Sequence, residues 1–235
     1  MTLPVWPGRL LLPSSQKWRL SNQSVSGGIS ISGNTQTAVV TGGGHWLCDA
    51  SQIILYDENH VKAARAWSAL LDGGATYFVL PFFDMAMAPR PISGGSYVNP
   101  TAPTITVTDY FNNPVGYAST LISATVASSA LLRATTAVIN IATGSAPTGG
   151  EHFSINHPTV GWRMYRIAQV TGISGSQYTC TIRPPLREAV SAGTAAEFDV
   201  PRCTMKVVAG KADSLDPDVS LGRRGRIDGY FEEAF

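Results

Sequence analysis

The sequence predicts an all-β protein that carries one α-helix and is divided into two β domains. Many short segments alternate apolar and polar residues, which is the period of a half-buried strand. Turn signals from glycine and proline recur every ~8–12 residues, as they do in β-sandwiches and barrels. One segment alone has the composition and the end signals of a convincing helix. These observations favour a β-sandwich followed by a second β-sandwich or barrel.

Residues 1–56 predict strands joined by turns. Alternation marks residues 18–20 and 28–33 as half-buried strands. Residues 37–41 and 52–56 are β-branched or apolar runs of strand length. Three consecutive glycines at 42–44 separate these two regions, and the next strand begins directly after them.

The predicted helix covers about residues 59–72. Asp57 or Asn59 can cap its first turn, and good helix formers follow. Two consecutive glycines at 73 and 74 end it. Its apolar stripe, which we expect to pack on the sheet, consists of Ala63, Ala66, Trp67, Leu70 and Leu71. The apolar residues 75–83 follow as a core strand.

A change of composition near Met85 indicates a domain boundary. Pro89, Pro91, Pro100 and Pro103 prevent a regular ladder, and residues 104–150 are rich in Thr, Ser, Ala and Val. Further strands are predicted at 104–108, 136–142, 152–155, 163–170, 177–182, 195–199 and 203–208, while 127–133 is ambiguous. Residues 226–235 alternate again and predict a terminal strand that rejoins the first domain. The predicted domains are therefore 1–90 plus 203–235, and 91–202.

The composition argues for a protein that works in contact with partners. Charged residues make up 14% of the 235 residues, well below the usual ~25%, and the net charge is +1. This balance argues against a general nucleic-acid or membrane-surface role, both of which need clustered basic residues. We expect no signal peptide and no membrane span, because no apolar run reaches ~18–20 residues.

Few residues have the spacing that catalysis or metal binding requires, so we expect neither an enzyme nor a bound metal or cofactor. His152 and His157 could form an accidental metal pair, but their spacing matches no known zinc motif. Cys48 beside His45 is weak support for a thiol catalyst. The paired carboxylates, which a hydrolase would need, each have a structural explanation at a helix start, a turn or a strand. Those carboxylates are Asp57 and Glu58, Asp216 and Asp218, and Glu232 and Glu233.

Two features are candidates for a protein interface. Arg223, Arg224 and Arg226 form the densest positive charge in the chain. They are either a solvated turn or partners for acidic groups on a neighbouring subunit, because arginine favours interface ion pairs. Trp6, between two prolines in an N-terminus that we expect to be flexible, is a candidate aromatic anchor at the surface of a partner.

Several segments together resemble the distal tail proteins of long, non-contractile-tailed bacteriophages. In the first half these are residues 26–36, 44–46, 65–71 and 77–84. In the second half they are residues 150–155, 164–167, 182–187, 198–201, 203–207 and 229–235. The likeness covers most of the chain except residues 91–130, and its motifs are structural rather than catalytic.

This resemblance implies a structural virion protein of the tail tip, assembled in the host cytoplasm. Such proteins form a ring, hexameric or trimeric, through a β-sandwich belt domain, and contact tail-tube, tape-measure and hub proteins. One alternative is a host-glycan-binding module, with Tyr110, Phe111 and Tyr117 as an aromatic platform beside Asn112 and Asn113. A tail-associated hydrolase is the third possibility.

Overall fold

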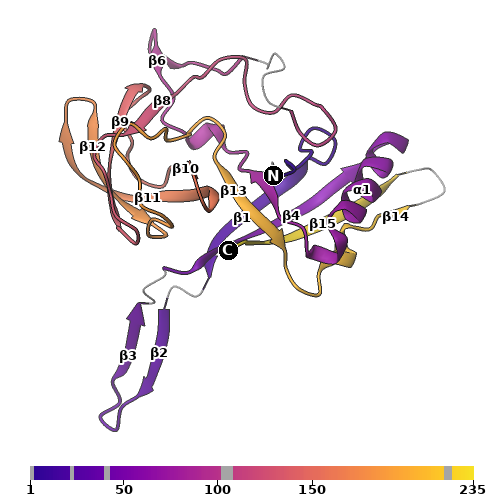
Figure 1. Cartoon of the computed structure of the whole chain (residues 1–235), viewed down its shortest axis with the longest axis horizontal. Coiled ribbons are helices and arrows are strands. Elements are labelled where there is room, and N and C mark those ends of the chain that lie inside the picture. The colour runs from indigo at the N-terminus through magenta and orange to yellow at the C-terminus, as the bar shows by residue number, and fades with distance from the viewer. Residues whose placement is uncertain (1–2, 22–23, 40–42, 102–107, 220–223) are drawn as a thin grey trace.

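The computed structural model describes residues 3–21, 24–39, 43–101, 108–219 and 224–235. Strands hold 46% of the residues and helical turns 11%, so the all-β prediction is confirmed. Two larger sheets, each with its own apolar core, form the body, and two small hairpins project from it (Figure 1).

The first sheet is antiparallel and six-stranded, in the order β1-β4-β15-β13-β5, with β14 paired to β15. Its strands are β1 (Pro13–Ser21), β4 (His45–Leu55), β5 (Phe78–Pro81), β13 (Arg202–Val207), β14 (Asp218–Val219) and β15 (Gly225–Glu233). The predicted return of the terminal segment is confirmed, because β15 lies between β4 and β13. A short 3-10 turn, η3 (Ala212–Leu215), lies between β13 and β14.

A bulge in β4 keeps the apolar side chains at both ends of this strand facing the core. Trp46, Cys48 and Ala50 point into the core, and the buried positions then change parity to Ile53 and Leu55. At the change, Gln52 has a φ of 55° and its N–H donates to Asp228 Oδ1 at 2.7 Å. The extra residue shifts the register, so that apolar side chains on both sides of the bulge reach the same core.

Helix α1 (Glu58–Leu70) begins and ends close to the residues that its capping signals predicted. It packs on the first sheet, as expected from its apolar stripe. The Asp57 carboxylate accepts hydrogen bonds from the N–H groups of Asn59 and His60, and so satisfies two free donors of the first turn. The buried helix residues are Val61, Ala63, Ala64 and Trp67. Ala66, expected on the buried stripe, is exposed. The helix ends at a short 3-10 turn, η1 (Asp72–Gly74), where Gly73 has a φ of 66°.

The second sheet is five-stranded, in the order β10-β11-β12-β9-β8. Its strands are β8 (Ser123–Val126), β9 (Thr136–Thr143), β10 (His152–His157), β11 (Gly161–Ser174) and β12 (Gln177–Arg183). Two register shifts between β11 and β12 bend the long strand β11, as bulges do, and the sheet curls into a half-barrel. Its core includes Phe153, Tyr165 and Phe198.

The first sheet is covered by α1 rather than by a second facing sheet of its own in the described part of the chain, so its architecture is a sheet with a helix rather than a two-sheet sandwich. Its strands come from residues 13–81 and 202–233, and those of the second sheet from residues 123–183. Between them lie the 3-10 turn η2 (Met85–Met87) and the small hairpin of β6 (Ile92–Ser93) and β7 (Ser96–Tyr97).

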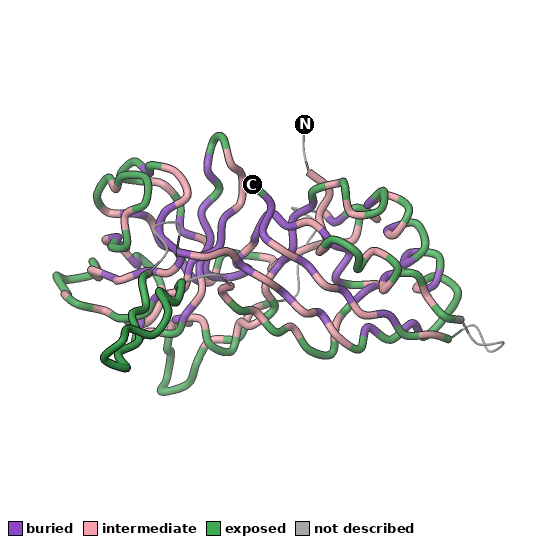
Figure 2. Tube along the Cα trace, turned by 90° about the horizontal axis from the view of Figure 1, so that it is seen from below, coloured by how far each residue is buried: buried purple, intermediate pink, exposed green. Residues whose placement is uncertain are grey.

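Two predicted strands differ from the structure, those at residues 195–199 and 28–33. The predicted strand at 104–108 lies almost wholly outside the described residues. Residues 195–199 make isolated bridges, at Ala195 and Glu197, instead of a strand. Residues 28–33 were expected to form a half-buried strand, whereas β2 ends at Ile29, the turn follows, and all of these residues are exposed. Figure 2 shows how exposed and buried segments are distributed along the chain.

Candidate interaction surface

A β-hairpin of residues 24–39, here called the arm, projects away from both large sheets (Figure 1). It consists of β2 (Ser24–Ile29) and β3 (Thr35–Val39) and leaves the body after β1. Every residue of β2 is exposed. The exposed apolar side chains of the arm are Val25, Ile29 and Ile31, the last of them completely exposed at the tip.

The tip of the arm is built by its own backbone. The Ser30 N–H donates to the Asn34 carbonyl at 2.9 Å, and the Gly33 N–H donates to the Ser30 carbonyl at 2.8 Å. Gly28, with a φ of 87°, coincides with a register shift between the two strands, which twists the arm. An isolated two-stranded hairpin is only marginally stable in water, so a surface that covers this arm would stabilise it.

The sequence carries a signal for the arm that strand periodicity does not detect. Between Arg19 and Asp49 there is no Lys, Arg, Asp or Glu. A solvated hairpin usually keeps charged residues along its edges, because charges discourage pairing with other strands. An uncharged hairpin that is exposed along its whole length therefore indicates a contact surface.

The predicted basic cluster is only partly described. Arg223 lies outside the described residues. Arg224 and Arg226 are exposed at the start of β15, and Arg226 stands opposite Asp218 in the β14–β15 register. Opposite charges at facing positions of a ladder attract one another, which accounts for Arg226 within this chain. The role of these arginines at an interface stays a prediction.

The predicted surface position of Trp6 is wrong. Trp6 has no exposed area, and its indole N–H donates to the Leu11 carbonyl at 3.0 Å. Its ring contacts Trp67 and Phe231 edge-on, with centroids 5.5 Å and 5.3 Å away. The two flanking prolines do not leave this segment free, because the Trp6 N–H bonds to the Val79 carbonyl at 2.9 Å and so fixes it beside β5. Trp6 is a core residue.

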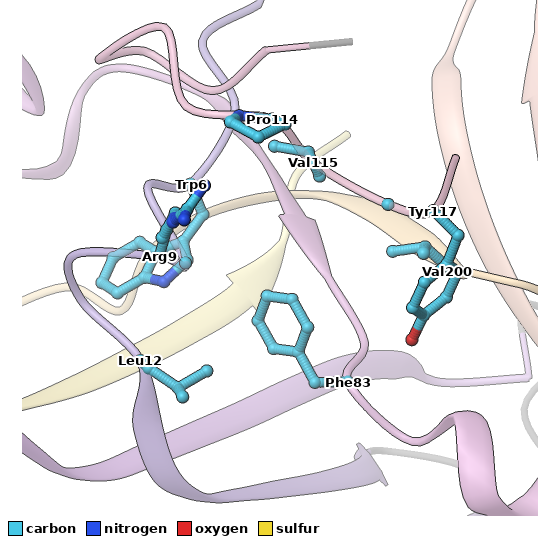
Figure 3. A pocket seen from close by; sticks show the side chains of 10 residues that line it. Trp6, Arg9, Leu12, Phe83, Pro114, Val115, Tyr117 and Val200 are labelled. Atoms are coloured by element: carbon cyan, nitrogen blue, oxygen red, sulfur yellow. The ribbon is translucent and has the colours of Figure 1, made fainter. Parts of the chain in front are cut away.

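A pocket of about 440 Å³, here called the junction pocket, opens where the N-terminal segment meets residues 114–117. Figure 3 shows Phe83 in the middle of its lining, with Trp6, Arg9 and Leu12 on one side and Val115, Tyr117 and Val200 on the other. Leu12 is 59% exposed and Phe83 44% exposed, so both offer apolar surface to a bound ligand or side chain. Arg9 and the Tyr117 hydroxyl are the polar groups that could orient it.

A buried ionic cluster fastens the two large sheets together. Glu233, at the end of β15, accepts two hydrogen bonds from Arg187, with Nε to Oε1 at 3.0 Å and Nη2 to Oε2 at 2.8 Å. Arg163 of β11 lies 3.5 Å from the same carboxylate and also donates to the Ala234 carbonyl. The Trp46 N–H donates to Glu233 Oε2 at 3.1 Å. A bidentate arginine with a buried carboxylate fixes orientation as well as distance.

The structure separates the histidines and the thiol that were candidates for chemistry. His152 and His157 are five residues apart on β10 and therefore point to opposite faces. Burial lowers the pKa of each to about 4; His152 packs against the Phe82 ring, and His157 Nε2 lies 2.7 Å from the Tyr165 hydroxyl. Cys48 points away from His45 on β4, and burial raises the pKa of its thiol, which disfavours the thiolate.

The carboxylates are engaged in local contacts. Asp57 caps α1, and its hydrogen bonds to His60 lower the pKa of the carboxyl group. Glu232 lies 3.3 Å from Lys206, and Glu233 belongs to the ionic cluster. Across the described ranges, no three His, Cys, Asp or Glu side chains gather to hold a metal ion. None of the described helices is long and apolar enough to cross a membrane.

The aromatic residues proposed as a glycan platform do not lie flat on the surface together. Tyr110 meets the Trp67 ring edge-on at 5.9 Å and the Phe111 ring at 5.1 Å. Asn113 is held by the buried Asp109 carboxylate, to which its backbone and side-chain N–H groups donate. Tyr117 instead faces the junction pocket.

Comparisons with known proteins add no assignment for this surface. No model of a known protein family matches the sequence, and no curated protein is significantly similar to it.

Proposed function

We propose that this chain is a structural subunit that assembles with copies of itself into a ring at the tail tip of a long-tailed bacteriophage. The observation that carries the proposal is the arm, an uncharged hairpin exposed along its length that presents Val25, Ile29 and Ile31 to solvent. In this function the arm of one subunit lies against the next subunit.

The energetics favour burying the arm. Removing one Val or Ile side chain from water contributes about 1.5–3 kcal/mol. Three such side chains on one hairpin therefore offer several kcal/mol towards association. Part of this gain offsets the entropy lost when docking orders the hairpin, because two strands alone are only marginally stable in water.

The low charge of the whole chain supports the same role. With 14% charged residues, few ionic groups lose their hydration when large surfaces meet. Catalysis requires titratable groups that converge, whereas His152 and His157 point to opposite faces of β10 and the Cys48 thiol is buried. These features favour assembly over chemistry.

The tail-tip location rests on the resemblance of the sequence to distal tail proteins. It implies partners in the tail tube, the tape measure and the tip hub, with no nucleic acid and no membrane among them. The number of subunits in the ring follows from the angle at which one arm meets the next subunit.

The test is the native mass of the full chain, measured by light scattering across concentration, alone and with the tail-tube protein. We expect a discrete closed oligomer, or a monomer that joins rings when tube protein is added. The variant Val25→Ser/Ile29→Ser/Ile31→Ser should be monomeric in both settings. The matched control Leu131→Ser/Leu132→Ser removes exposed apolar side chains elsewhere and should assemble as the wild type does. A wild-type chain that stays monomeric and ignores tube protein would overturn the proposal.

A further inference from the structure

The junction pocket and the arm are two apolar features of one chain, and the described residues leave both open to solvent. The pocket is lined by aromatic and aliphatic side chains and has a volume within the ~300–1,000 Å³ of specific binding pockets. Its rim presents Leu12 and Phe83, both substantially exposed. The arm ends in Ile31, whose side chain touches nothing that would shield it from water.

The chemistry of the two features matches. The arm carries no charged residue, so placing its tip in the apolar pocket buries no unpaired charge. A branched aliphatic side chain suits the accessible apolar lining of Leu12, Phe83 and Val115. Arg9 and Tyr117 add hydrogen-bond donors to the pocket lining, and these suit the carbonyl oxygens of the arm's turn.

The arm and the pocket of the same chain lie at opposite ends of β1. Leu12 lies directly before β1, whereas the arm leaves the body after the end of that strand. The nine residues of β1 span roughly 30 Å at ~3.3 Å each. The arm then continues away from the body instead of folding back (Figure 1). In this arrangement the arm tip lies away from the pocket of its own chain, which leaves that pocket open to the arm of another molecule.

We infer that the junction pocket is the receptor for the arm tip of a neighbouring copy, with Ile31 as the side chain that enters it. This inference rests on the proposed self-assembly and adds to it the partner surface. The contact joins two different patches, so each molecule both gives an arm and receives one. Such a head-to-tail contact closes into a ring when a whole number of rotations between neighbouring subunits adds up to 360°.

Directed disulfide formation tests this pairing. All three native cysteines are buried, so introduced surface thiols dominate the reaction. Mixing Ile31→Cys with Leu12→Cys under mild oxidation should give a cross-linked dimer on a non-reducing gel. The double variant should give a ladder that ends at the ring. The matched control pairs Ile31→Cys with Ala66→Cys, an exposed position on α1, and should cross-link at least tenfold more slowly.

A second pair of variants tests the same contact by measuring self-association, without introduced thiols. Ile31→Asp and Leu12→Asp, both at exposed positions, should each weaken self-association roughly tenfold to hundredfold. Combining them should cost little more than either alone, because both remove one contact. Thr37→Asp, elsewhere on the arm, is the control that should keep most of the affinity.

The outcomes separate the two proposals. Oligomers that form without cross-linking above the control overturn the pocket assignment and leave self-assembly standing, with another segment in the pocket. A chain that neither cross-links nor assembles, alone or with tail-tube protein, overturns both.

Discussion

Replacing Glu233 by glutamine isolates the ionic cluster that joins the two large sheets. The substitution keeps the shape of the side chain and removes its charge. Arg163 and Arg187 then remain buried, with side chains only 3% and 10% exposed, and without the carboxylate that neutralises them. One oxygen acceptor also becomes an amide donor facing guanidinium donors.

The expected loss of stability is large. Removing one partner of a buried ion pair costs about 3–5 kcal/mol, because the remaining charge stays desolvated. The Trp46 N–H and both Arg187 bonds converge on the same carboxylate, so the upper part of this range applies. Single domains are stable by only about 5–15 kcal/mol in total. The substitution therefore removes a substantial share of the free energy of unfolding.

Urea unfolding followed by tryptophan fluorescence measures this loss. With a slope of about 2 kcal/mol per molar urea, the midpoint for Glu233→Gln should fall by about 2 M. The matched control is Glu232→Gln, one residue earlier on β15, where the partner is the half-exposed Lys206. That exposed pair should contribute less than about 1 kcal/mol. Equal midpoints for the two variants would refute the assignment of the cluster as the main polar fastening between the sheets.

Two further predictions concern Trp6 and His152. Trp6→Ala should destabilise the protein by about 3–5 kcal/mol in urea unfolding, because a fully buried ring leaves a cavity; a loss under about 0.5 kcal/mol would mean that the ring lies at the surface after all. Because burial lowers the pKa of His152 to about 4 in the folded protein, the unfolded chain takes up its proton first as the pH falls. Stability should therefore decline between about pH 6.5 and pH 4 and be unaffected by this group above that window, with a contribution of up to about 3 kcal/mol. His152→Phe should flatten part of that decline when unfolding is measured at several pH values, with His157 responsible for the remainder; an unchanged pH profile would contradict this account.

The elements that local chemistry determines could be predicted from the sequence. Asp57 and Gly73 mark the ends of α1 because a carboxylate cap and a residue with positive φ act within a few positions of chain. The alternation of residues 226–235 predicted β15 for the same reason. A period of two is a property of one strand and needs no knowledge of its neighbours.

The features that depend on distant segments could not be predicted. Residues 28–33 alternate like a half-buried strand, but residues 24–38 of the arm are exposed in the described part of the chain, and the period of two does not show whether another segment covers a strand. Trp6 looked free beside its prolines because its partners Trp67 and Phe231 lie far away in the sequence. The ionic cluster unites residues 163, 187 and 233, whose spacing carries no recognisable pattern.

The place of β15 in the first sheet has a consequence for the order in which the protein matures. The five strands of the second sheet and the buried residues of its core lie within one continuous stretch, residues 122–198, so this sheet can form soon after that stretch leaves the ribosome. The first sheet must wait, because its β4 and β13 are bridged by β15, which follows every other strand in the chain. Until then β4 and β13 have open edges beside an already folded neighbour. The sheet from which the arm projects is therefore completed only after residues 225–233 have been made.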